Sequence, residues 1–324
     1  MKIGVLLINL GTPAALTENA VRDFLDFFLS DPYVIALPTP LRYLLVKYFI
    51  LKTRPKKTLE AYQKIWTPEG SPLLVNTQNF CRALQQALGD NFCVALGMRY
   101  SEPSIEQSLT ELNKKDCEKI IIFPLFPHFS AATTQTIFDE IHRIIQKKNI
   151  RAPLLFIREF YDQDFFTTSL AHQIKQSHAA NFSTPQTHLL LSYHGLPNSH
   201  SDAQRYRHAC FSTSEKIATI LGISANQFTT AFQSRVGFTK WIAPYTDHVI
   251  IQLQKNGIKN LVVVCPSFIT DCIETLEEIN IRLRVQWMAL GGSQFDIVAC
   301  VNDTKAWTTQ VGEYLLLLTR PPNP

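Results

Sequence analysis

The sequence predicts an α/β protein made of two similar halves, each with a parallel sheet. Three observations support this fold class. Short apolar runs alternate with longer helical patterns along the whole chain, as in successive strand–helix–strand units. The run VLLINLGTP at 5–13 is matched by LLLSYHGLP at 189–197, so a strand that ends in Gly-x-Pro occurs in both halves. The length of 324 residues suits two domains of roughly 100–200 residues each.

The expected strands are the apolar runs that end at proline, glycine or a polar turn. In chain order they cover 3–10, 92–98, 119–124, 153–158, 188–193, 228–233, 260–265 and 295–300. The expected helices lie between them and have the longer helical period. They cover 17–29, 72–88, 103–114, 131–148, 162–178, 202–221, 244–256, 270–284 and 303–318.

The two halves also agree in how their other strands end. KIIIFP at 119–124 corresponds to KNLVVVCP at 259–266, and ALGMR at 95–99 corresponds to AFQSR at 231–235. We therefore divide the chain into domains at 1–160 and 161–324, and we expect their equivalent strand ends to face one cleft. The first domain carries an insertion near 30–70 that the second lacks.

Composition excludes several classes of protein. Apolar residues make up 46% of the chain and charged residues 18%, so we expect a packed core and no disorder. The net charge of +4 gives no reason to expect a nucleic-acid partner. No run approaches the roughly 18 apolar residues of a membrane span. We interpret MKIGVLLINLGTP as a first strand, because its apolar run passes into Gly-Thr-Pro without a cleavage site.

The seven cysteines are scattered and form no C-x-x-C pair. A dispersed, odd-numbered set is typical of a reducing cytoplasm. It argues against zinc ribbons, disulfide frameworks and cysteine-bound iron–sulfur clusters. We therefore expect a cytoplasmic protein.

His194 is the first candidate for chemistry. It ends the apolar run in LSYHGLP at 191–197, directly before a Gly-x-Pro turn, and it falls opposite Leu10 of the first half. An apolar side chain suits the core end of a strand, whereas ligand sites in α/β sheets form at the carboxyl ends of strands. From the residues alone, His194 is either a catalytic or ligand histidine at that edge, or a core residue.

An acidic helix is the second candidate. In CPSFITDCIETLEEI at 265–279, Asp271, Glu274 and Glu278 are spaced i, i+3 and i+7, which places them on one face of an α-helix. The alternative is a solvated acidic first turn that is favourable to the helix dipole.

Two further segments gather polar and aromatic residues. TTAFQSRVGFTKWIAPYTD at 229–247 includes Ser234 and Trp241 near a strand end, although the aromatics could belong to the core and its arginine could pair with its aspartate. The basic segment at 51–74 holds Arg54, Tyr62 and Ser71, and its alternative interpretation is a solvated basic helix.

Together these segments resemble the ferrochelatase family over nearly the whole chain. SYHGLP combined with the downstream DCIETL is the most specific part. The other motifs are LLINLGTP, FLSDPYVIALP, GMRYSEPSI and FQSRVGFTKWIAPYTD. The resemblance implies two Rossmann-like domains around a porphyrin cleft, and the insertion of ferrous iron into a porphyrin. Fe²⁺ would be a substrate, with no permanently bound cofactor.

The resemblance also implies roles for individual residues. His194 and Glu274 would form the catalytic and metal-binding pair, with Asp271 and Glu278 as supporting carboxylates. Imidazole can accept a proton near neutral pH and, with carboxylate, suits Fe²⁺. Which of the pair takes the protons and which passes on the metal stays open. Leu10 would face the other side of the ring. The porphyrin-binding residues would be Arg54, Tyr62, Ser71 and Ser234 near the propionates, and Trp241 on the ring.

The chain departs from the family pattern in a few places. Ser267 stands where the family usually has glycine, and His128 where it usually has glutamine. Arg282 follows on the acidic helix, which argues against a long line of carboxylates. No cysteine follows Cys300, so the C-terminal iron–sulfur cluster of some relatives is not expected.

Other functions fit the same residues. The chain could act on coproporphyrin III instead of protoporphyrin IX, or insert cobalt or nickel, because His and Glu do not select iron by themselves. A non-catalytic tetrapyrrole-binding protein is an alternative of another class. Segment 41–52, LRYLLVKYFILK, suggests a hydrophobic entrance that favours protoporphyrin, and with the lysines that follow it suggests peripheral contact with the inner face of a membrane. Its three charges do not fall on one helical face.

Overall fold

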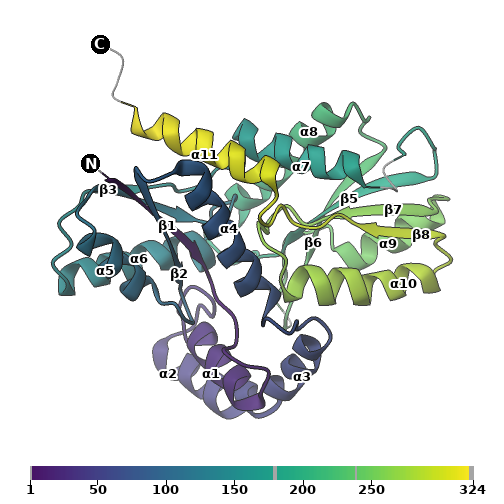
Figure 1. Cartoon of the computed structure of the whole chain (residues 1–324). Coiled ribbons are helices and arrows are strands. Elements are labelled where there is room, and N and C mark those ends of the chain that lie inside the picture. Colours follow the sequence, from purple (N-terminus) through teal and green to yellow (C-terminus); the bar gives the residue numbers. More distant parts are fainter. Residues whose placement is uncertain (1, 178–180, 238, 321–324) are drawn as a thin grey trace. The chain divides into compact units, whose positions relative to one another are not determined.

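The computed structural model describes residues 2–177, 181–237 and 239–320. Residues 178 and 321–324, where one expected helix ends and the chain terminates, lie outside this part. The contacts divide the chain into two compact units, Met1–Glu159 and Phe160–Pro324. The described residues form eight strands in two parallel four-stranded sheets, one in each unit, which confirms the predicted α/β class (Figure 1).

The first unit has the sheet order β2-β1-β3-β4. Its strands are β1 (Lys2–Asn9), β2 (Phe92–Met98), β3 (Cys117–Pro124) and β4 (Leu154–Phe156). Its helices include α1 (Glu18–Leu29), α4 (Pro72–Leu88), α5 (Ile105–Lys114), the π-helix η2 (Ala131–Gln135) and α6 (Thr136–Lys147). α5 and α6 cover one face of this sheet and α4 lies on the other (Figure 1).

Alternation along β1 explains these two layers. Leu6 and Ile8 pack in one cluster with buried residues of α5 and α6 such as Leu109 and Ile141. Val5 is also fully buried, and it points to the opposite face because successive strand residues alternate. Apolar residues on both faces produce the uninterrupted run that made this strand visible in the sequence.

The insertion of the first unit is helical. It contains α2 (Thr39–Leu44), the π-helix η1 (Leu45–Ile50) and α3 (Leu51–Gln63), which gather with α1 at one end of the sheet (Figure 1). Val46 and Leu51 are buried there, whereas Tyr48 and Phe49 are exposed.

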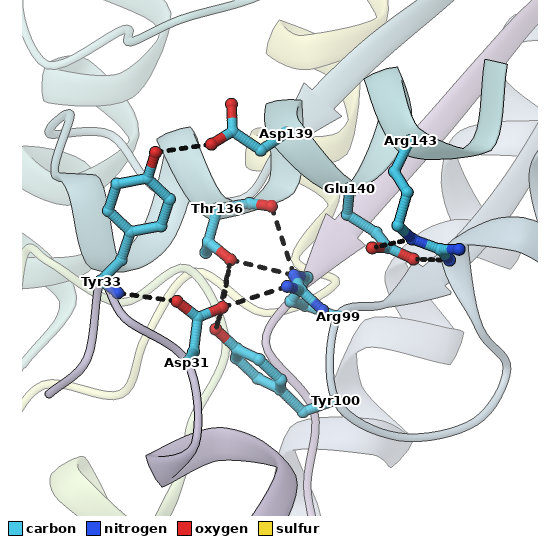
Figure 2. Close-up of polar contacts among 8 residues, drawn as sticks. All are labelled: Asp31, Tyr33, Arg99, Tyr100, Thr136, Asp139, Glu140 and Arg143. Carbon is cyan, nitrogen blue, oxygen red and sulfur yellow. Dashed lines mark hydrogen bonds and ion pairs between the residues drawn. The ribbon is translucent and has the colours of Figure 1, made fainter. Parts of the chain in front are cut away.

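Asp31 fastens the base of this insertion to the sheet (Figure 2). Its buried Oδ2 accepts hydrogen bonds from Arg99 Nη2 at 3.0 Å, Tyr100 Oη at 2.9 Å and Thr136 Oγ1 at 2.7 Å. Oδ1 accepts from the Tyr33 amide at 2.8 Å. One carboxylate thus joins the loop after α1, the turn after β2 and the start of α6, and its burial is offset by four donors.

The second unit has the order β6-β5-β7-β8, the same arrangement as the first. Its strands are β5 (Thr187–His194), β6 (Phe228–Gln233), β7 (Asn260–Val264) and β8 (Gln294–Ile297). Its helices are α7 (Asp164–Gln176), α8 (Ala203–Leu221), α9 (Thr246–Lys255), the π-helix η3 (Glu274–Leu283), α10 (Arg284–Ala289) and α11 (Lys305–Thr319). The matching strand orders confirm the internal similarity read from the sequence.

Two layers of helices also cover the second sheet. Leu190 and Val263 pack with Ile250 of α9, Ile279 of η3 and Trp287 of α10. α7, α8 and α11 lie together on the other face (Figure 1). The equivalent positions of β1 and β5 in their sheets place Leu10 and His194 at the ends of corresponding strands.

The observed elements differ from the expected ones mainly where π-helices occur. The helix expected at 270–284 begins instead at Glu274 and is a π-helix through Leu283. The helix expected at 131–148 also starts as a π-helix, and the insertion holds helices that the strand–helix pattern did not show. In the described ranges, no helix is both long and apolar enough to span a bilayer.

Two buried histidines predict acid sensitivity of the fold. Burial lowers the pKa of His128 from 6.5 to about 3 and that of His188 from 6.5 to about 4. Both are neutral when folded but bind protons when unfolded below pH 6.5, so their contribution to stability is complete above that pH and is lost as the pH falls toward 4. We expect the melting temperature to drop between pH 7.5 and 5, and to drop less in the double variant His128→Gln, His188→Gln. Equal drops in wild type and variant would contradict this account.

Candidate functional site

The candidate site lies where the central strands of the second sheet end. The chain leaves β5 to form β6 on one side and later forms β7 on the other side of β5. Ligand sites in open α/β sheets form at the carboxyl ends of strands where the order reverses in this way. His194 ends β5, and Ser267 follows β7 by three residues.

Three hydrogen bonds close a ring around the main chain of His194. Its N–H donates to Ser267 Oγ at 3.2 Å, and Tyr206 Oη donates to its carbonyl at 2.9 Å. Ser267 and Tyr206 are 2.9 Å apart, and because the tyrosine proton is already used, the serine hydroxyl donates to the tyrosine. The hydroxyl of Ser267, which departs from the family pattern, thus helps to fix the end of β5.

One contact of the His194 imidazole indicates which ring nitrogen carries its proton. Its Nδ1 lies 2.7 Å from the carbonyl oxygen of Gly195, and a carbonyl can only accept, so Nδ1 carries the proton. Nε2 of the neutral ring then keeps its lone pair for a proton or a metal ion. The ring is half-buried and meets the edge of the Phe268 ring at 6.2 Å between centroids.

Gly195 allows the ends of β5 and β6 to approach closely. Its N–H donates to Gln233 O at 2.9 Å. A Cβ at this position would lie 2.8 Å from Gln233 O and 3.3 Å from Cε3 of Trp241. Trp241 therefore lies beside the turn that follows His194, held by its own Nε1 bond to Val236 O at 3.0 Å. Its expected contact with a porphyrin stays a prediction.

The structure corrects the expected face of three carboxylates. Asp271 precedes η3, and its side chain turns toward the loop after β8. Oδ2 accepts from Asn302 Nδ2 at 2.8 Å and Oδ1 from Thr275 Oγ1 at 2.9 Å, while the Asp271 N–H donates to Asn302 Oδ1 at 2.9 Å. The sequence predicts that Asp271 shares an α-helical face with Glu274 and Glu278, but the helix starts at Glu274, three residues later. Asp271 therefore supports the backbone before Glu274.

The winding of η3 keeps Glu274 and Glu278 near one line along the helix. A π-helix bonds each N–H to the carbonyl five residues back, so its turn holds more residues than an α-turn and side chains four or five apart lie near one line. Glu274 is half-buried. Burial raises the pKa of the neighbouring Cys272 thiol, and the negative charge of Glu274 raises it further.

Ser234 holds the carboxylate of Glu278. The Ser234 N–H donates to Oε1 at 2.8 Å and its hydroxyl to Oε2 at 2.6 Å. Ser234 has φ +65, a left-handed conformation that turns both donors toward the helix. Arg282 approaches the same carboxylate at 3.8 Å and pairs with buried Glu277 at 2.8 Å. The expected contact of Ser234 with a propionate stays a prediction, and the structure shows its bond to Glu278.

Residues expected near the porphyrin in the first unit meet around Thr12. The Thr12 hydroxyl donates to Ser71 Oγ at 2.7 Å and lies 3.4 Å from Tyr62 Oη, and all three side chains are buried. Leu10 is half-buried two residues earlier, and Arg54 is half-buried on α3. The structure thus brings Tyr62 and Ser71 to the turn after Leu10 through Thr12.

Sequence reasoning missed several residues that build the site. Ser267 was noted only as a departure, and Tyr206, Asn302 and Thr12 drew no attention, because a single hydroxyl or amide side chain on a helix or in a loop has no spacing pattern. The equivalence of AFQSR and ALGMR did point to Gln233 and Ser234 as strand-end residues. Among the residues that the structure describes, no group of three or more His, Cys, Asp or Glu side chains is placed to hold a metal ion.

The close approach at Gly195 predicts the cost of adding one methyl group. Gly195→Ala would press Cβ against a backbone carbonyl that cannot rotate away, so the ends of β5 and β6 must separate or Trp241 must move. We expect the free energy of unfolding to fall by about 1–3 kcal/mol, the usual cost of overpacking. Urea denaturation measures it, and an unchanged free energy would show that the strand ends are not in close contact.

Known proteins resemble this chain over nearly its whole length. The family model for ferrochelatase matches residues 2–315. A ferrochelatase from Legionella pneumophila is 44% identical over 326 residues, covering 95% of this chain and 96% of the relative. A ferrochelatase from Coxiella burnetii is 42% identical over 334 residues, covering 96% of this chain and 92% of the relative.

Solved structures share the fold at low sequence identity. SirB from Bacillus subtilis with Fe³⁺ is similar at a TM-score of 0.59 and 11% identity, over 98% of this chain and 95% of that chain. The sirohydrochlorin chelatase SirB from Bacillus subtilis subspecies spizizenii in complex with cobalt has a TM-score of 0.55 at 12% identity, over 96% and 92%. These likenesses support the two-sheet fold alone. The match to the family model and to relatives over nearly the whole length shows that the chain belongs to the ferrochelatase family.

Proposed function

We propose that this ferrochelatase, a metal chelatase of the lyase class in haem biosynthesis, inserts Fe²⁺ into protoporphyrin IX. The reaction exchanges two pyrrole protons for the metal, so the enzyme must accept protons and release iron. Fe²⁺ is a substrate in this proposal, and no permanently bound cofactor or iron–sulfur cluster takes part. The observation that carries the proposal is the 2.7 Å contact between Nδ1 of His194 and Gly195 O, from which we infer that Nδ1 carries the proton and Nε2 keeps a lone pair.

His194 and Glu274 form the proposed catalytic and metal-binding pair. Gln233 is the register partner of His194 and also bonds the main chain of Glu274, so both groups belong to one neighbourhood of the second unit. Asp271 and Glu278 act as supporting carboxylates. Asn302 already holds the carboxylate of Asp271, and Ser234 holds that of Glu278. An imidazole and a carboxylate bind Fe²⁺ less completely than a full ligand set, which suits transfer.

The remaining residues are proposed to contact the porphyrin. Arg54 offers a planar fork to a propionate, and Trp241 offers a flat face to the ring. Leu10 supplies an apolar wall, and its carbonyl is fixed by the Tyr100 N–H at 2.8 Å. Tyr62, Ser71 and Ser234 are the proposed partners of the propionates.

An exposed apolar face favours protoporphyrin IX as the substrate. It consists of Leu41, Tyr43, Leu44, Tyr48 and Phe49. Two of the three charges within this segment have partners in the protein, and Lys47 also lies 6.0 Å from the ring centroid of Tyr43, a member of this face. Arg42 is buried and donates to Leu37 O at 2.6 Å, and Lys47 pairs with Asp26. These exposed apolar side chains suit a porphyrin with apolar vinyl groups.

Anaerobic incubation with Fe²⁺ and each porphyrin tests the proposed substrate. We expect the absorption spectrum of protoporphyrin IX to change from free base to haem, with a higher kcat/KM than coproporphyrin III. A higher kcat/KM for coproporphyrin III would identify the four-propionate porphyrin as the substrate. Haem that stays bound without turnover would indicate a tetrapyrrole carrier.

Substitutions of His194 and Glu274 test the roles proposed for them. His194→Ala removes the proton acceptor, and loss of a general base costs roughly 10²–10⁴-fold in rate. Glu274→Gln keeps size but removes charge and should lower kcat sharply, whereas Glu278→Gln should do less because Ser234 holds that carboxylate. Steady-state rates and porphyrin binding measured by fluorescence quenching are the readouts. Wild-type turnover of His194→Ala, or a larger loss in Glu278→Gln than in Glu274→Gln, would sink the assignment.

The same apolar face is proposed to contact a membrane peripherally, on the cytoplasmic side. Phe49 is 69% exposed and Leu41 is 56% exposed. Lys52, Lys56 and Lys57 follow on α3 with exposed side chains. Each cation near an anionic surface contributes about 1 kcal/mol, screened by salt, and inserted apolar groups add a part that salt does not screen.

Liposome flotation tests this contact. We expect the protein to float with anionic vesicles, more weakly at high salt, and to lose binding in the double variant Leu41→Ser, Phe49→Ser. The double variant Val285→Ser, Met288→Ser removes side chains of 64% and 47% exposure from α10 and is the matched control. If the protein does not float under any condition, the proposed membrane contact is wrong, and the apolar face serves only the substrate.

A further inference from the structure

Gln233 joins the backbones that carry the proposed metal pair. It is the last residue of β6, and its side chain is 4% exposed. Its carbonyl accepts from the N–H of Gly195 at 2.9 Å, directly after His194. Its side-chain Nε2 donates to the carbonyl of Glu274 at 3.1 Å. One residue thus contacts the main chain next to His194 and the main chain of Glu274.

The orientation of the Gln233 amide is fixed by its partners. Ser192 Oγ lies 2.7 Å from Oε1, and a Glu274 carbonyl can only accept, so Nε2 must point to Glu274 and Oε1 to Ser192. The Ser192 hydroxyl also lies 2.8 Å from Thr246 Oγ1, which can donate to it in turn. Cys265 Sγ lies 3.7 Å from the same Oε1. The amide is satisfied at both ends, so a buried carboxylate could not replace it without losing the donor.

The bond to Glu274 falls on the first residue of η3. A side chain that bonds a carbonyl at a helix start restrains the main chain there, and with it the direction of the Cα–Cβ bond of Glu274. Metal-site geometry tolerates errors of only about 0.5 Å, and groups that orient ligands typically contribute 10–100-fold to metal affinity or activity. The buried amide of Gln233 therefore restrains the main chain that carries the Glu274 carboxylate.

Resting on the proposed function, we propose that Gln233 is a positioning residue that sets the spacing between His194 and Glu274 for iron transfer. It touches neither substrate in this account. Its loss should therefore affect the metal more than the porphyrin. KM for Fe²⁺ should rise about 10-fold or more in Gln233→Met, while KM for porphyrin stays within about twofold.

The experiment uses two Gln233 variants and a matched control. Gln233→Met keeps the side-chain length without hydrogen bonds, and Gln233→Glu keeps the acceptor for Ser192 but places an oxygen against the Glu274 carbonyl. Gln252→Met, on the exposed side of α9, makes the same chemical change outside the site and should behave as wild type. Ser192→Ala removes only the hydroxyl that orients the amide, and it is the milder variant should either Gln233 variant fail to fold.

Two readouts decide the proposal. The first is the pair of KM values with Fe²⁺ and protoporphyrin IX, and the second is hydrogen–deuterium exchange of 274–283, which does not depend on activity. We expect faster exchange and a raised KM for Fe²⁺ in Gln233→Met and Gln233→Glu, a smaller effect in Ser192→Ala, and none in Gln252→Met. Wild-type exchange in the Gln233 variants, or equal rises of both KM values, would overturn the positioning role. A wild-type protein that makes no haem would instead refute the proposed function. Hydrogen–deuterium exchange of 274–283 would still show whether Gln233 restrains the start of η3.

Discussion

The hydrogen bond from Gly195 N–H to Gln233 O, 2.9 Å long, holds the ends of β5 and β6 together, and the rest of the site depends on it. Only a residue without Cβ allows this approach, because an added methyl carbon would lie 2.8 Å from the carbonyl oxygen. The turn that follows directs the Gly195 carbonyl back to Nδ1 of His194. A constraint of the backbone therefore determines which nitrogen of the imidazole is free to react.

The carboxylates are sorted by their hydrogen bonds. Asp271 is held by Asn302 and Thr275, and Glu278 by two donors of Ser234, so both are engaged in supporting the backbone and the helix. Glu274 is half-buried, and its main chain is anchored by Gln233. In the proposed function, Glu274 binds and releases iron while the two other carboxylates keep their positions, and an incomplete ligand set suits such a transfer.

Much of the fold could be predicted, because the strands are apolar on both faces and read as continuous runs. All eight expected strands exist, and the repeat of Gly-x-Pro endings correctly predicted two sheets of the same order. The winding of η3 could not be predicted, since hydrophobic periodicity does not distinguish a π-helix start from an α-helix, and this displaced Asp271 from its expected face. His194 was predicted as a strand-end residue, whereas its ring of bonds with Ser267 and Tyr206 joins positions up to 73 residues apart, and no local pattern shows such contacts.

The tautomer of His194 tests the central claim most directly. Nitrogen-15 NMR of the histidine-labelled protein, with His194→Gln to assign the signal, reports which ring nitrogen carries the proton in the neutral form. The account predicts a protonated Nδ1 and an unprotonated Nε2, because Nδ1 donates to Gly195 O at 2.7 Å. A neutral ring protonated at Nε2 would contradict it, since that nitrogen could then neither accept a pyrrole proton nor bind Fe²⁺.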